Sequence, residues 1–77
     1  MPYRRIADLP VGVQHVLPAH AQHIYLAAYN QAWDTYRRAA RRRAHASREE
    51  TAHRVAWGAV KRSYRKDAQS GLWHRRH

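Results

Sequence analysis

Apolar residues recur every three or four positions from Ala19 onward, which is the spacing of one face of an α-helix. This stripe comprises Ala21, Tyr25, Ala28, Ala32, Tyr36 and Ala39, with Ile24 and Tyr29 beside it. Arg37 and Arg41 fall opposite its centre, as expected for a solvated face. The pattern therefore predicts a long amphipathic helix with one buried side.

A second helical pattern begins at Ser47. Ser47 and Glu50 have the spacing of a capping box, in which the serine hydroxyl accepts a hydrogen bond from the backbone N–H of Glu50. The apolar stripe that follows comprises Ala52, Val55, Ala56, Ala59 and Val60, with Trp57 and Tyr64 at its edges. Arg54, Lys61 and Arg65 share the opposite face, so this segment predicts a second long amphipathic helix.

The two ends of the chain carry shorter signals. Pro10 favours a helix start, and a short helix follows with one face formed by Val13, Val16 and Leu17 before Pro18. Residues 3–6 suit an extended strand, residues 67–71 are turn-like, and Trp73 offers a last apolar anchor. We expect residues 3–6 to pair with the tail as two strands leaning on the helices, because an isolated pair is marginal in water.

The predicted fold is therefore mainly α, with one short and two long helices and a minor two-stranded sheet formed by the chain ends. A chain of 77 residues is long enough for one modest core, and we expect a single domain over residues 1–77. A hydrophobic fraction of 44% supports a folded state rather than disorder.

Composition narrows the function. Fifteen Lys+Arg against five Asp+Glu give a formal net charge of +10, which points to a polyanionic partner. Cys is 0, which excludes disulfides, thiol catalysis and cysteine-based zinc sites. No apolar run approaches a membrane span and no secretory signal is evident at the start, so we expect a cytoplasmic protein.

These blocks of residues resemble the ChaB family over nearly the whole chain. In the first half the resemblance rests on Leu9, Pro10, Val13, Leu17, Pro18, Ala21, Gln22, Ile24, Tyr25, Asn30, Ala32, Trp33 and Tyr36. In the second half it rests on residues 46–53 and on Val55, Ala56, Trp57, Ala59, Val60, Lys61, Tyr64 and Trp73.

The resemblance implies a small helical fold with a minor sheet and no catalytic residues. Members of the family are labelled cation transport regulators through association with a cation/proton antiporter, and some related sequences are described as DNA-binding. This chain departs from the family pattern at Gly58, where relatives usually have alanine. It also departs between the two blocks, where a mixed or acidic segment is replaced by a basic one. That second change favours anions over divalent cations as partners.

The strongest candidate site is a run of arginines at the junction of the two long helices: Arg37, Arg38, Arg41, Arg42, Arg43 and Arg48. Guanidinium groups bind phosphate bidentately, so we predict non-specific docking on nucleic-acid phosphates, helped by Arg54, Lys61 and Arg65. The alternative for these residues is a solvated face that keeps the chain soluble. Whether residues 37–48 are helix or loop stays open.

Other candidate chemistry is weaker. The helical spacing of the aromatic residues favours core packing over base stacking. His20 and His23 lack further ligands for a metal, and His53 is best explained as an imidazole hydrogen-bonded at the core edge near Glu49. We expect no enzyme, because Glu49 and His53 form a dyad without a nucleophile and without oxyanion donors. We also expect no metal and no cofactor.

Two function classes therefore remain open. In the first, a small regulatory or adaptor protein docks on nucleic acid. In the second, the chain regulates a membrane cation/proton antiporter through an acidic protein surface or anionic lipid.

Overall fold

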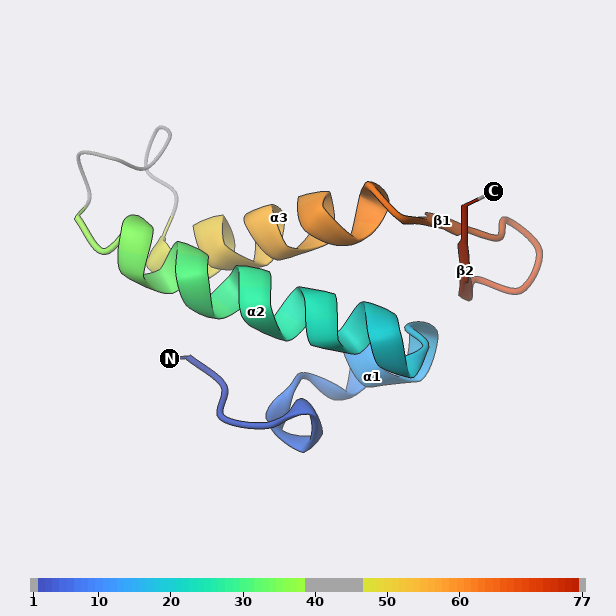
Figure 1. Cartoon of the computed structure of the whole chain (residues 1–77), viewed down its shortest axis with the longest axis horizontal. Coiled ribbons are helices and arrows are strands. Elements are labelled where there is room, and N and C mark those ends of the chain that lie inside the picture. The colour runs from blue at the N-terminus through green and yellow to red at the C-terminus, as the bar shows by residue number, and fades with distance from the viewer. Residues whose placement is uncertain (1, 39–46, 77) are drawn as a thin grey trace.

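The computed structural model describes residues 2–38 and 47–76, which form helices followed by a C-terminal hairpin (Figure 1). Their bounds, in chain order, are η1 Ile6–Asp8, α1 Val11–Val16, α2 Ala19–Thr35, α3 Arg48–Lys61, β1 Tyr64–Lys66 and β2 Trp73–Arg75. The long helices α2 and α3 lie side by side and antiparallel, with α1 at one end of α2. The prediction of a mainly α fold with one short helix, two long helices and a minor sheet is confirmed.

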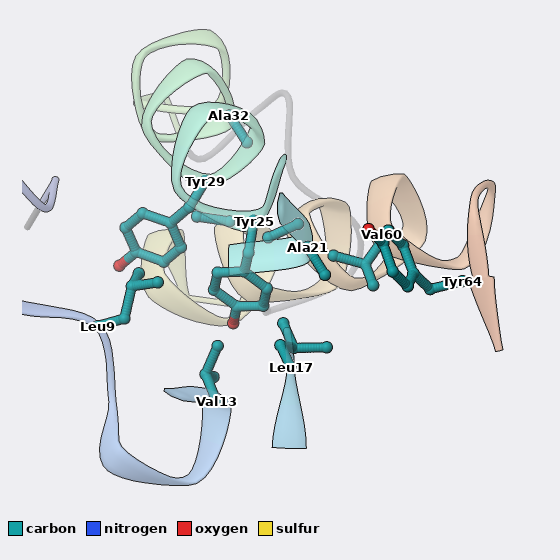
Figure 2. Close-up of a cluster of buried hydrophobic side chains, with 11 residues drawn as sticks. Leu9, Val13, Leu17, Ala21, Tyr25, Tyr29, Ala32, Val60 and Tyr64 are labelled. Carbon is teal, nitrogen blue, oxygen red and sulfur yellow. The ribbon is translucent and has the colours of Figure 1, made fainter. Parts of the chain in front are cut away.

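The core lies between α2 and α3 and is covered by the N-terminal segment. Tyr25 and Tyr29 on α2 are fully buried, and the side chains of Leu9, Val13 and Leu17 point toward them from the N-terminal segment (Figure 2). The other buried apolar residues are Ala21, Ala32, Ala52, Ala56, Val60 and Tyr64. Small alanines on both helices allow their backbones to approach, while the tyrosines supply the volume of a core that contains no Phe.

The helix boundaries follow from local chemistry. The Ser47 hydroxyl accepts a hydrogen bond from the Glu50 backbone N–H at 3.0 Å, which confirms the predicted cap of α3. Pro10 and Pro18 each immediately precede a helix, where a missing N–H costs nothing. Glu49 and Glu50 occupy the first turn of α3 and stabilise the positive end of its dipole.

The predicted pairing of residues 3–6 with the tail is wrong. The tail strand β2 pairs antiparallel with β1, in a register that places Arg65 opposite His74 and Lys66 opposite Trp73. The predicted turn joins these strands, and so short a hairpin closes with little loss of chain entropy. Tyr3 is instead held by Asn30, whose side chain accepts from its N–H at 2.9 Å and donates to its carbonyl at 2.8 Å.

No helix within the described ranges 2–38 and 47–76 has the length and apolar character needed to cross a lipid bilayer.

Candidate functional site

The predicted phosphate-binding residues fall at different places in the fold. Arg37 and Arg38 directly follow α2, are exposed, and line a hollow of about 740 Å³ together with Asp34 and Thr35. Arg41, Arg42 and Arg43 lie outside the described residues.

Arg48 differs from the other candidates because it packs against the protein. Its guanidinium carbon lies 4.2 Å from the centroid of the Trp33 ring, and its Nε donates a hydrogen bond to the Trp33 carbonyl at 2.7 Å. The side chain is only half exposed. A stacked and hydrogen-bonded guanidinium of this kind ties the start of α3 to the end of α2.

Arg54 and Lys61 lie seven residues apart on the outer face of α3, and both are exposed, as the helical pattern predicts. Arg65 is exposed on β1, where it faces His74 across the sheet. These three cations thus occupy solvent-accessible positions, but Arg65 belongs to the hairpin rather than to the helix on which we expected it.

The hairpin gathers cations into a cluster of which only Lys61 and Arg65 were predicted from the sequence. Together with the end of α3 it carries six exposed cations: Lys61, Arg62, Arg65, Lys66, Arg75 and Arg76. A doublet at 61–62, another at 65–66 and a third at 75–76 are visible in the sequence. These doublets form a cluster only if the turn at 67–71 closes a hairpin, because the hairpin brings the third doublet next to the second.

Few acids offset these cations. Within residues 2–38 and 47–76, the basic side chains within salt-bridge distance of a carboxylate are two histidines, His53 beside Glu49 at 3.7 Å and His74 beside Asp67 at 3.8 Å, and no described lysine or arginine is among them. The Asp67 carboxylate is held in the turn, where it accepts from the Gln69 N–H at 2.9 Å. That hydrogen bond lowers the pKa of Asp67 below its usual value, with further help from Ser70 and His74.

A cluster of polar aromatic side chains lies at the edge of the core around His53. Its Nδ1 is hydrogen-bonded to the Tyr25 hydroxyl and its Nε2 lies 3.7 Å from Glu49 Oε1, which confirms a hydrogen-bonded imidazole at the core edge. The Tyr29 ring lies 4.7 Å from the imidazole. Burial raises the pKa of Tyr25 and of Tyr29 well above the usual range, so both phenols stay neutral at physiological pH.

His20 also contacts a tyrosine, since its Nδ1 lies 2.9 Å from the Tyr64 hydroxyl. In the part of the chain that the structure describes, no group of three or more histidine or acidic side chains could hold a metal ion.

The comparisons with known proteins agree on one family of small proteins. A sequence model described as ChaB matches residues 9–76, so the chain belongs to the ChaB family. Two relatives named "Putative cation transport regulator ChaB", from Escherichia coli (strain K12) and Shigella flexneri, are each 55% identical over 76 residues, which is 99% of this chain and 99% of each relative. A structure titled "NMR solution structure of the putative cation transport regulator ChaB" matches with a TM-score of 0.81 and 54% identity, covering 99% of this chain and all of that one.

Proposed function

We propose that this ChaB-family chain is a non-enzymatic regulatory or adaptor protein of the cytoplasm that binds nucleic-acid phosphates without sequence preference. The observation that carries the proposal is that its lysines and arginines are exposed and not paired with carboxylates. Every described lysine and arginine except Arg48 is exposed, and none of those within residues 2–38 and 47–76 lies within salt-bridge distance of a carboxylate. Exposed guanidinium groups without a carboxylate partner are available for phosphate oxygens.

The charge is distributed over both ends of the helix pair. Arg37 and Arg38 follow α2 at one end, while the hairpin cations lie at the other (Figure 1). Arg54 and Lys61 connect the two ends along α3. Such a distribution suits a long, uniformly charged backbone better than a small anion, because several phosphates can be contacted together.

Three of the five amide side chains, which are the usual readers of adenine edges, are held by the fold, whereas Gln31 and Gln69 are exposed. Asn30 is occupied by both backbone groups of Tyr3. Gln14 and Gln22 donate to backbone carbonyls of the N-terminal segment at 2.7 and 2.8 Å. Amides held in this way contribute to the fold and are not free to discriminate bases.

The test is a titration of labelled duplex DNA by fluorescence anisotropy at several salt concentrations. Each phosphate contact contributes about −0.9 to the slope of log K against log salt. The triple variant Arg62→Gln, Arg65→Gln, Arg75→Gln is expected to flatten the slope by about 2 to 3. The control Gln69→Ala changes an exposed neutral residue of the same hairpin and keeps the slope. Absence of micromolar binding at low salt, or a triple variant with an unchanged slope, would refute the proposal.

A second candidate function is favoured by the printed name of the relatives, cation transport regulator, at 55% identity over 99% of both chains. Here the same cations would contact acidic segments of a transporter or anionic headgroups, each nearby cation contributing about 1 kcal/mol at a membrane surface. Sedimentation with vesicles of phosphatidylserine, set against vesicles of phosphatidylcholine, separates it from the first. Vesicle binding without DNA binding would select the second function.

A further inference from the structure

One part of the surface combines exposed apolar side chains with the hairpin cations. A hollow of about 510 Å³ is lined by apolar residues of the α1–α2 junction and the tail: Val16, Leu17, Pro18, Leu72 and Trp73. A second hollow, of about 310 Å³, shares Val16 and Trp73 with it and is also lined by Trp57. Because Val16 and Trp73 line both hollows, the two hollows are neighbours, and we refer to them together as the Val16–Trp73 depression.

Three cations line this depression. Arg75 lines the larger hollow together with His15 and His74, while Lys61 and Lys66 line the smaller one. The single acid of the hairpin, Asp67, lines neither hollow, and its carboxylate is occupied by the turn. A ligand here must therefore bring negative charge to the rim and an apolar group to the centre.

The residues that line the larger hollow indicate which kind of apolar group fits into it. Four of the residues that line the larger hollow are aliphatic or proline, which suits a branched side chain, and the Tyr64 that also lines it is only 4% exposed. A nucleobase requires an accessible aromatic face. The Trp73 ring is partly buried and lies 5.2 Å from the Trp57 ring at 31°, so one of its sides already packs within the protein.

We propose that this Val16–Trp73 depression is the docking site for an acidic protein segment that inserts one apolar side chain. Interfaces concentrate their affinity in such an anchor within a pocket, while rim charges set the association rate and the choice of partner. The site goes beyond the phosphate binding proposed above, which uses the cations alone and needs no hollow.

The test uses the full ¹⁵N-labelled chain and a capped peptide with a central leucine between two runs of three glutamates. Two matched peptides replace the leucine by alanine or the glutamates by lysines. The leucine peptide is expected to shift the indole N–H signal of Trp73, assigned with Trp73→Phe, while that of Trp33 at the far end of α2 stays in place. It is also expected to bind at least tenfold more tightly than the alanine peptide, which corresponds to about 1.4 kcal/mol.

Two variants with equal exposure locate the anchor. Leu72 is 39% exposed inside the depression and Val55 is 37% exposed on α3 outside it. Leu72→Ser should reduce binding of the leucine peptide to the level of the alanine peptide, whereas Val55→Ser should leave it unchanged. Circular dichroism checks that both variants are folded.

Several results would overturn the proposal. They are equal affinities for the leucine and alanine peptides, equal losses in Leu72→Ser and Val55→Ser, or no peptide binding at all. If the peptides do not bind, but oligothymidylate shifts the Trp73 signal and no longer binds to Leu72→Ser, the depression is a base-binding site. Binding of duplex DNA by Leu72→Ser should equal that of the unaltered chain, so the two proposals can fail separately.

Discussion

Two buried tyrosines on α2 provide the sharpest test of the core. Tyr25 and Tyr29 are both fully buried and lie one helical turn apart, but their hydroxyl groups are satisfied differently. The Tyr25 hydroxyl is hydrogen-bonded to His53 Nδ1. The Tyr29 hydroxyl has no hydrogen-bond partner in the part of the chain that the structure describes. Removing the same atom from each therefore has opposite consequences.

For Tyr25→Phe, the hydrogen bond is lost and the imidazole keeps an unpaired nitrogen. The bond itself contributes about 1 kcal/mol, and a buried group left without its partner costs about 1–3 kcal/mol. Because His53 is half exposed and water can reach part of it, we expect a loss of about 1–2 kcal/mol in the free energy of unfolding. For Tyr29→Phe, the desolvated and unpaired oxygen disappears, so the free energy of unfolding should stay the same or rise by about 1 kcal/mol.

Urea denaturation followed by circular dichroism measures both variants, with unchanged m-values as the control for two-state behaviour. In a domain of this size about 1 kcal/mol moves the melting temperature by about 4–8 °C, so thermal melts should separate the two variants clearly. The reasoning is refuted if Tyr29→Phe destabilises the protein as much as Tyr25→Phe does.

Three further predictions concern the helix junction and the hairpin. Arg48→Met should lower the free energy of unfolding, measured in urea, by about 1–2 kcal/mol, because the stacking on Trp33 and the hydrogen bond to its carbonyl are lost. The control Arg54→Met should change it by no more than about 0.5 kcal/mol. Equal losses in the two variants would contradict the role assigned to Arg48. Gly71→Ala should cost about 1–2 kcal/mol in the same assay, because Gly71 has a φ of 76°, and an unchanged stability would contradict the turn geometry. Asp67 has a lower pKa in the folded protein than in the unfolded chain, so its ionised carboxylate stabilises the hairpin at any pH above the unfolded pKa. This stabilisation is lost as the pH falls through the folded pKa of Asp67. The amide chemical shifts of the turn should therefore change in acid, and Asp67→Asn should abolish that change.

The parts of the fold that the sequence predicts are those set by neighbours along the chain. The cap at Ser47 depends on residues three positions apart, and the apolar stripes depend on helical spacing. The partner of the tail strand depends on competition between distant segments. In that competition residues 3–6 are held elsewhere, because the Asn30 side chain occupies the backbone of Tyr3 across 27 residues, and the short turn favours β1. No periodicity in the sequence encodes such a contact.

The candidate site shows the same division. Exposure of Arg54 and Lys61 follows from their place on a helix and was predictable. The contact between Arg48 and Trp33 joins two helices across fifteen residues, so a count of positive charges could not distinguish Arg48 from its neighbours. The cluster at the hairpin was missed because charges at 61–66 and 75–76 become neighbours only when β1 pairs with β2.

The position of the charges also limits what a partner must offer. Both ends of the helix pair carry exposed cations, but among the described residues Asp34, Glu49 and Glu50 lie at the end with Arg37 and Arg38, whereas Asp67 is the single acid of the hairpin. The described residues of the two ends also differ in apolar surface, because the hollows lined by Trp73 lie beside the hairpin, whereas Arg37 and Arg38 border a hollow whose other described lining residues are Asp34 and Thr35. A partner that selects the hairpin end can therefore recognise both its cations and its apolar residues. The effect of Leu72→Ser on each ligand then separates recognition by charge from recognition by shape, since duplex binding depends on the first and peptide binding on both.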